Sequence, residues 1–426
     1  MSRSLEKARA RFARGDRAGA ERHLRAALAH QPNDPDALHL AGLLHLGRHE
    51  HGAAIAALRR AVALRTPFPE AMLDLSVACN RTGEHELARQ LCELLLTLSP
   101  NAPAACINLG MAWKGLGRLP EAKRAFEAAG DHPMARFNLG HTLLLEGDLE
   151  GGLPLLEARR ALLGTGRGLS GAPWAGDARP EATLLVIPEQ GLGDVLLASR
   201  FFVPLLSRFA RVVVHAPASL RRLLATLDPR LEVVTALEGV RWDLWAPVMS
   251  LPHLLGVRSL EALPVGPWLH VAPGEAPGAR PRVGINWAGN PSYAYDAVRS
   301  TSLGTLAPLL AIRDVEWLSL HRGARETEAA AMNLAQPLAG ARDFLDTARV
   351  VASLDLVIST ETAIPNLSGA MGVPTCVLTV RDADWRWRGW YADVTVCDQD
   401  APGNWFGPIA KAARAIQRLL EARAAA

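Results

Sequence analysis

LLVIPEQGLGDVLLASR, residues 184–200, is the stretch that decides the fold of the second part of this chain. Its apolar, β-branched start predicts a buried strand, Gly191 and Gly193 predict a turn, and the pattern from Val195 onward predicts a helix. At the carboxyl edge of a parallel sheet, such a turn lets a ligand approach the backbone closely. Asp194 is then expected at the mouth of a cleft. A plain tight turn is the alternative explanation of the two glycines.

The sequence after residue 180 continues this alternation of apolar runs and helical patterns. The alternation predicts an α/β fold with mostly parallel sheets. A Pro/Gly-rich stretch at 272–281 divides the strands, so we expect two Rossmann-like halves, 181–275 and 276–426, the second with an apolar helix at 406–420. The expected strands are Leu184–Ile187, Val212–Val214, Leu231–Val234, Val283–Trp287, Glu316–Leu320, Asp355–Ser359 and Cys376–Leu378.

The first third of the chain repeats. Helix starts at Pro35, Pro69 and Pro103 recur at intervals of 34 residues. Residues 1–163 resemble a tetratricopeptide-repeat solenoid, whose unit is about 34 residues long and whose stacked copies bury a continuous core. Such solenoids usually bind a segment of another protein. We place a Gly/Pro-rich linker at 164–180. The glycines expected between paired helices are Gly15, Gly47, Gly83, Gly117 and Gly147.

Three asparagines fall on the first helix of successive repeats: Asn80, Asn108 and Asn138. A side-chain amide offers both donors and an acceptor, so a ladder of asparagines could hold the backbone of a docked peptide. We therefore predict that these three residues bind the acceptor protein. The alternative is that they bond neighbouring loops or face water.

Length and composition exclude several classes of protein. The 426 residues are 49% hydrophobic with a net charge of +3, which indicates a soluble protein of several domains and no nucleic-acid partner. Its five cysteines form no CxxC pair, so we expect no disulfide framework, no zinc site and a cytoplasmic location. The charged N-terminus argues against a signal peptide, and no apolar run reaches the ~18 residues of a membrane span.

Polar residues follow one expected strand of the second half. VGINWAGNP, residues 283–291, ends a strand and turns, and Arg299 and Ser300 come before the next helix. Backbone N–H groups of the turn, together with the Arg299 guanidinium, could bind a phosphate. A surface turn beside a solvated arginine is the alternative.

Thr360-Glu361-Thr362 follows another expected strand and begins a helix. The N-terminus of a helix at the carboxyl end of a parallel strand attracts a diphosphate, because unpaired N–H groups and the helix dipole both favour anions. Thr360 or Thr362 could equally cap the helix. Because a carboxylate repels phosphate, we expect Glu361 to reach a ribose or sugar hydroxyl if it touches the ligand.

Asp382-Ala383-Asp384 spells the DxD motif with which metal-dependent glycosyltransferases hold a divalent ion. A motif this short arises readily by chance, and we predict no metal site. The loop that follows, residues 385–390, is dense in Trp and Arg. Its aromatic rings could stack on a base or a sugar, or could serve loop packing alone.

Several segments, in the same order along the chain, resemble those of bacterial tetratricopeptide-repeat glycosyltransferases, whose catalytic half is similar to heptosyltransferases and protein O-GlcNAc transferases. The resemblance implies a GT-B fold, a nucleotide-sugar donor held by the C-terminal half, no obligatory metal or cofactor, and an acceptor that faces the N-terminal half. Some members resemble flagellin glycosyltransferases that use an activated nonulosonic acid. The segments are APWAGD (172–177), EQGLGD (189–194), WDLWAPVMSLPHLLG (242–256), GINWAGNP (284–291) with Arg299-Ser300, and SLDLVISTETAIPNLSGAMGVP (353–374) with Asp384-Trp385-Arg386-Trp387.

These observations predict a site. Asp194 is expected to be the catalytic base that takes the proton of the acceptor hydroxyl in an inverting transfer, a role the resemblance to heptosyltransferases also implies. The alternative is that Asp194 caps the helix that begins at Val195. The predicted donor-binding residues are Gly191, Gly193, Asn286, Trp287, Gly289, Asn290, Arg299, Thr360, Glu361, Thr362 and Asn366.

We therefore expect a glycosyltransferase that moves a sugar from a nucleotide-sugar to Ser or Thr of a protein docked on the repeats, with flagellin as one candidate acceptor. Two alternatives stay open. One is a non-catalytic scaffold that binds a partner through its repeats and has a degenerate GT-B half. The other is a heptosyltransferase of cell-surface glycan.

Overall fold

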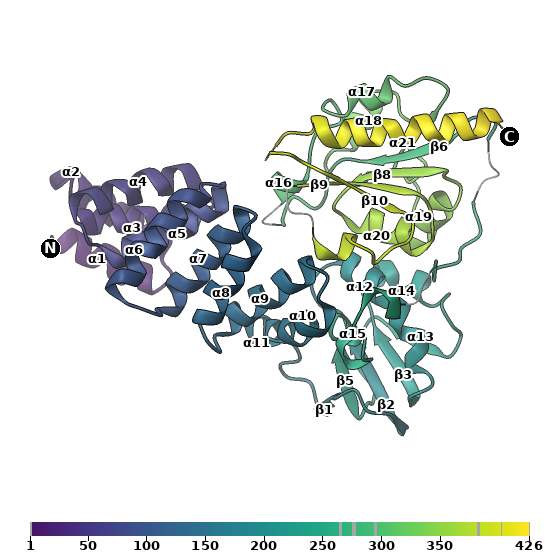
Figure 1. Ribbon diagram of the computed structural model, residues 1–426, viewed down its shortest axis with the longest axis horizontal. Coiled ribbons are helices and arrows are strands. Elements are labelled where there is room, and N and C mark those ends of the chain that lie inside the picture. Colours follow the sequence, from purple (N-terminus) through teal and green to yellow (C-terminus); the bar gives the residue numbers. More distant parts are fainter. Residues whose placement is uncertain are drawn as a thin grey trace. The chain divides into compact units, whose positions relative to one another are not determined.

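The computed structural model describes residues 2–263, 266–274, 278–293, 296–380, 384–401 and 403–425. The chain divides into two compact units, Met1–Thr142 and Leu143–Ala426. The first unit is helical, and the second carries two five-stranded sheets with helices around them (Figure 1).

Helices α1 to α8 of the first unit pack in order along the chain, each against its sequence neighbour. Pro35, Pro69 and Pro103 are the first residues of α3, α5 and α7, as predicted, because proline tolerates the first helical position, where its missing N–H is not needed. The helices are α1 (Arg3–Ala13), α2 (Arg17–His30), α3 (Pro35–Leu46), α4 (His51–Leu64), α5 (Pro69–Thr82), α6 (His85–Leu98), α7 (Pro103–Gly115), α8 (Leu119–Ala128) and α9 (Pro133–Leu145), which crosses into the second unit.

Glycine allows close packing within two of these helix pairs. A Cβ on Gly42 of α3 would lie 2.5 Å from the side chain of Leu58 on α4. A Cβ on Gly110 of α7 would overlap the ring of Phe126 on α8 in the same way. Since protein interiors are packed as densely as organic crystals, neither position has room for a larger residue.

The first sheet of the second unit has the strand order β1-β5-β2-β3-β4, with every neighbouring pair parallel. Three of its strands are at predicted positions, whereas the two-residue β1, inside the stretch we assigned to a linker, and the four-residue β5 were not predicted. The strands are β1 (Ala172–Pro173), β2 (Arg179–Ile187), β3 (Phe209–His215), β4 (Leu231–Val234) and β5 (Leu244–Pro247). Its helices are α12 (Leu192–Ala198), η1 (Ser199–Phe201), α13 (Phe202–Leu205), α14 (Ala218–Leu224), η2 (Val248–Ser250), α15 (Leu251–Leu254) and η3 (Leu260–Ala262).

The second sheet has the order β10-β9-β8-β6-β7 and is also parallel. Four strands match the prediction, and only the edge strand β10 was missed. Its strands are β6 (Arg282–Asn286), β7 (Glu316–Ser319), β8 (Leu356–Thr360), β9 (Thr375–Thr379) and β10 (Val394–Asp398). Its helices are α16 (Asp296–Arg299), α17 (Ala307–Leu310), α18 (Glu326–Ala331), α19 (Phe344–Val351), α20 (Ala363–Ala370), η4 (Trp385–Trp387) and α21 (Phe406–Ala425).

The long terminal helix α21 lies along the second sheet (Figure 1). Its buried residues Ala412 and Ile416 join the apolar core formed by strands of that sheet, so the expected apolar helix at 406–420 is present and runs on to Ala425. No described helix is both long and apolar enough to cross a membrane.

Two short helices, α10 (Leu149–Leu156) and α11 (Arg159–Leu163), precede the first sheet. We placed both within the repeat domain, residues 1–163, and that boundary stays a prediction; their contacts group them with the second compact unit. The predicted connector at 272–281 includes residues 275–277, which lie outside the described residues.

Candidate functional site

Each sheet of the second unit has a point where the strand order reverses. In the first sheet this switch point lies between β2 and β5, and in the second it lies between β6 and β8. Ligands of open α/β sheets bind outside the carboxyl ends of the strands at such points. Gly191–Asp194 follow β2, whereas Asn286–Asn290 begin at the last residue of β6 and Thr360–Thr362 at the last residue of β8. The structure thus places all three predicted segments at switch points.

Asn286 links the segments of the second switch point through hydrogen bonds of its side chain. Its side-chain Nδ2 donates to Ser359 Oγ at 3.1 Å and to Thr362 Oγ1 at 3.0 Å, and its Oδ1 lies 3.1 Å from Nδ1 of His321. The side chain is buried, and its amide protons are both used internally. Asn286 therefore supports the loops, and its contact with a donor stays a prediction.

Trp287 and Thr360 are fully buried as well. The Trp287 ring packs in the core cluster of the second sheet and lies 4.8 Å from the imidazole of His321, ring centre to ring centre. Burial lowers the pKa of His321, so this imidazole is neutral at pH 7. Neither side chain presents atoms at the surface, which favours a packing role, and their contact with a donor stays a prediction.

The loop after β6 brings Arg299 back over Gly289. A Cβ on Gly289 would lie 2.5 Å from Nη2 of Arg299, so the guanidinium packs directly on the glycine. Arg299 Nε donates to Asp296 Oδ1 at 3.3 Å, and its guanidinium carbon lies 4.5 Å from the ring centre of Tyr293. Asn290 accepts from the backbone N–H and the hydroxyl of Ser292, and so closes a turn. Arg299 stays partly exposed, in keeping with an anion-binding role.

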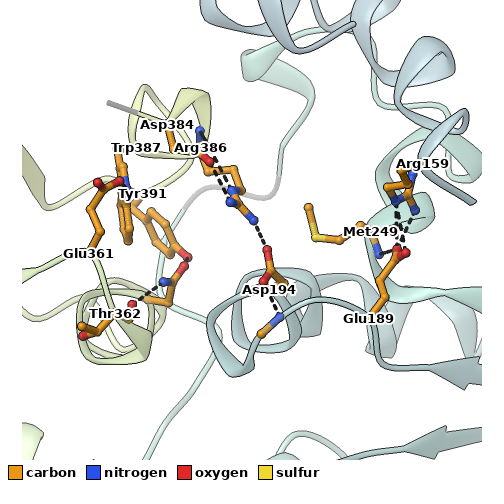
Figure 2. A network of polar contacts seen from close by, with 12 residues as sticks. Arg159, Glu189, Asp194, Met249, Glu361, Thr362, Asp384, Arg386, Trp387 and Tyr391 are labelled. Carbon is orange, nitrogen blue, oxygen red and sulfur yellow. Dashed lines mark hydrogen bonds and ion pairs between the residues drawn. The ribbon is translucent and has the colours of Figure 1, made fainter. Parts of the chain in front are cut away.

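Glu361 lies beside the start of α20, and its carboxylate is partly buried. The indole Nε1 of Trp387 donates to Glu361 Oε1 at 2.8 Å (Figure 2). Burial, with a smaller contribution from the charge of Asp384, raises the pKa of Glu361 to about 7, against the opposing effects of the Trp387 hydrogen bond and the Arg299 charge. Thr362 is the N-cap of α20 and accepts from the N–H of Ile364, which is the capping role that the sequence left open.

Asp194 lies between its own helix and a loop far along the chain. Its Oδ2 accepts the N–H of Gly191 at 2.8 Å, which is a capping interaction at the start of α12. Its Oδ1 forms an ion pair with Arg386, whose guanidinium also binds Asp384 (Figure 2). Burial lowers the pKa of Arg386 to about 10, so Arg386 still carries its charge at neutral pH.

Gly193 owes its identity to helix packing. A Cβ at this position would lie 2.7 Å from Nδ2 of Asn366, on the facing helix α20. Asn366 in turn donates to the Thr362 carbonyl at 2.9 Å and accepts from the Tyr391 hydroxyl at 2.7 Å. Helices α12 and α20 thus bring the two switch points together, and Gly193 and Asn366 lie where these helices touch.

An aromatic stack that the sequence did not predict lies next to Asn366. The rings of Trp268 and Trp387 each stack on Tyr391 with centres 5.7 Å apart, and the Arg200 guanidinium lies 3.9 Å from the ring centre of Trp268. Burial lowers the pKa of Arg200 to about 10. The run of Trp and Arg at 385–390 was the one sequence signal for this stack, and it indicated aromatic packing but not its partners.

The asparagines of the helical unit bond internally. Asn80 Nδ2 donates to the Asn108 carbonyl at 2.9 Å, and Asn108 Nδ2 donates to Ser76 Oγ at 2.9 Å. Asn138 is buried and donates to the Met134 carbonyl of its own helix at 2.8 Å. These contacts favour the structural alternative, and the peptide-binding ladder stays a prediction.

The described residues contain no group of three or more His, Cys, Asp or Glu side chains that could hold a metal ion. Of the DxD motif, Asp382 and Ala383 lie outside the described residues. Asp384 is described, and its carboxylate binds Arg386 at 2.7 Å.

Known proteins resemble this chain in two ways. Two tetratricopeptide repeat family models match it, one at residues 5–64 and 39–103 and the other at 103–128 and 133–158. The N-terminal helices form a tetratricopeptide-repeat solenoid. The second resemblance is to Protein FlbA of Caulobacter vibrioides, which is 27% identical over 377 residues, 76% of this chain. The aligned region spans 62% of the length of FlbA.

Solved structures similar to the chain include MamA from residue 41 to its end, of Desulfovibrio magneticus RS-1, at 19% identity over 40% of this chain and 99% of the solved chain, with a TM-score of 0.34. A thermophilic tetratricopeptide-repeat protein of Thermus thermophilus, TTC0263, is 22% identical over 39% of this chain and 91% of its own, with a TM-score of 0.33.

Proposed function

We propose that this protein is a glycosyltransferase that moves a sugar from a nucleotide-sugar donor to Ser or Thr of a protein docked on its tetratricopeptide repeats, with flagellin as one candidate. The proposal rests on the contact between α12 and α20, which brings the two switch points together. Each is a common ligand position in its own sheet, and joining them brings groups suited to a donor and to a reacting hydroxyl together.

The donor is expected on the second sheet. Arg299 supplies a partly exposed guanidinium, and α20 presents its N-terminus nearby, so both favour the diphosphate of the donor. Glu361, with its pKa near 7, is in part protonated at neutral pH and can then donate a hydrogen bond instead of repelling an anion. Gly289 and Asn290 shape the loop between them. We also propose that the two sheets together form a GT-B fold.

Asp194 is proposed as the catalytic base. The acceptor hydroxyl oxygen attacks the anomeric carbon while the bond to the donor phosphate oxygen breaks, and the nucleotide leaves with that bonding pair. The hydroxyl proton passes to Asp194. In the structure Arg386 neutralises this carboxylate, so Asp194 acts as a base only after Arg386 has moved away or has turned to the leaving phosphate.

The same ion pair favours a second candidate function. A carboxylate that caps a helix and binds an arginine is fully used by the fold, as expected for a non-catalytic scaffold. A scaffold binds its partner and, in some cases, a nucleotide, but transfers nothing.

Mass spectrometry of flagellin, and of proteins that co-purify with the full chain, tests the proposal in cells with and without this protein. We expect sugar-sized mass additions on Ser or Thr of an acceptor only where the protein is present. Identical masses in both cells, with the partner still captured, would establish the scaffold instead.

A further inference from the structure

Arg159 is an arginine in the interior of the second unit. It is the first residue of α11 and only 2% of its side chain is exposed. Its Nη2 donates to Glu189 Oε1 at 2.6 Å, and its Nε lies 3.1 Å from each carboxylate oxygen of Glu189 (Figure 2). Its Nη1 donates to Glu157 Oε1 at 2.9 Å. No sequence pattern indicated this role, because Arg159 stands among helical residues like any surface arginine.

Glu189 connects this arginine to both strands of the first switch point. It belongs to the loop after β2, and its Oε1 also accepts the backbone N–H of Met249, just after β5, at 3.1 Å. Ser250 completes the network, because its Oγ accepts from Arg159 Nη2 at 2.7 Å and donates to Glu157 Oε2 at 2.9 Å. One buried cluster thus fixes α11 against the carboxyl ends of β2 and β5.

The backbone beside Glu189 needs such support. Gln190 has φ 60°, in the left-handed region that a residue with a side chain seldom adopts. Conformations of this kind persist only where the surroundings hold them. Gly191 comes next, and its N–H donates to Asp194 Oδ2 at 2.8 Å, so the Asp194 carboxylate is bonded to the backbone two residues after Glu189.

We infer that Arg159 is a positioning residue that holds the loop 188–194 through Glu189 and thereby sets the place of Asp194. Helices α10 and α11 continue the repeat pattern in sequence, and α11 then helps to position a loop of the α/β unit. Only the assignment of Asp194 to a reaction rests on the proposed function; the control of the loop by Arg159 does not.

Hydrogen–deuterium exchange on the full chain tests this inference. In Arg159→Met, the amides of Gly191 and Met249 should exchange about tenfold faster or more, because a hydrogen bond to a charged group contributes at least an order of magnitude to such an equilibrium. Amides of β6 should keep their rate. The matched control is Arg211→Met, since the Nε and Nη2 of Arg211 both donate to Glu232 Oε2 in the same sheet, at an exposed position away from the loop.

Unchanged exchange at Gly191 and Met249, or an equal increase in β6, would overturn the inference. If Arg159→Met does not fold, Glu189→Gln replaces it and should show the same local pattern, since it removes the charge that Arg159 binds. A readout of transfer separates the two proposals. Arg159→Met should lower the rate of transfer while leaving calorimetric affinity for UDP, GDP or CMP unchanged, and the exchange result stands even if no transfer is found.

Discussion

The carboxylates at the two switch points of the second unit have different kinds of hydrogen-bond partner. At the first, Glu189 and Asp194 are each bound by a buried or half-buried arginine, Arg159 and Arg386. At the second, Glu361 takes its hydrogen bond from the neutral indole of Trp387, and its pKa rises to about 7. Carboxylates at the two switch points therefore have different partners, an arginine at the first and a neutral indole at the second, where burial raises the pKa of Glu361.

The largest effect is expected from Asp194→Asn. Asparagine caps a helix nearly as well as aspartate but cannot take a proton, so the variant should fold normally and lose about 10²–10⁴-fold of the transfer rate. The rate should be measured with saturating donor, and folding by circular dichroism. A folded variant that transfers at the parental rate would leave Asp194 with the cap alone and remove the first switch point from catalysis.

Arg299→Ala should weaken nucleotide binding by about 1.5–3 kcal/mol, because it removes a charge-assisted bond to the donor phosphates. Calorimetry with UDP, GDP and CMP measures this change. Arg349→Ala is the control, since Arg349 is about half exposed and binds Asp346 on its own helix. Equal affinities of parent and Arg299→Ala for every nucleotide would place the phosphates away from the second switch point.

The raised pKa of Glu361 predicts a pH dependence of stability. The folded protein holds this proton up to about pH 7, whereas the unfolded chain releases it near 4.5, so the free energy of unfolding should fall as pH rises between these values. We expect a loss of about 1–2 kcal/mol, allowing for screening of a partly exposed group. Denaturant unfolding at pH 5, 6, 7 and 8 measures it, and Glu361→Gln should flatten this part of the curve. Parallel curves for parent and variant would contradict the pKa assignment.

The smallest effect is expected in the repeats, where Asn108 bonds internally. Asn108→Ala should lower the stability of the helical unit by about 1 kcal/mol, because the hydrogen bond that Asn108 donates to Ser76 is lost. Capture of the acceptor should stay at the parental level. Gln90→Ala, on the exposed face of α6, is the control for thermal unfolding. Weaker capture by Asn108→Ala, but not by the control, would restore the asparagine ladder as a docking surface.

Periodicity predicted most of the elements in both units. The starts of α3, α5 and α7 and most strands of the two sheets are where the sequence placed them, since alternating and helical patterns report which side of an element is buried. Candidate loops were found at the right edges of the sheets for the same reason. Trp287 shows the limit, because an aromatic residue after a strand can equally line a ligand site or fill the core beneath it.

The sequence by itself determined the helical repeat, the alternation of strands and helices, and which loops lie at the carboxyl ends of parallel strands, because all of these follow from local pattern. Tertiary structure alone decided which charges meet. Arg386 and Asp194 are 192 residues apart, Arg159 and Glu189 are 30 apart, and no pattern links either pair. Electrostatic energy depends on distance in space and on burial. The fold therefore decides which carboxylate pairs with an arginine and which has its pKa raised to about 7 by burial.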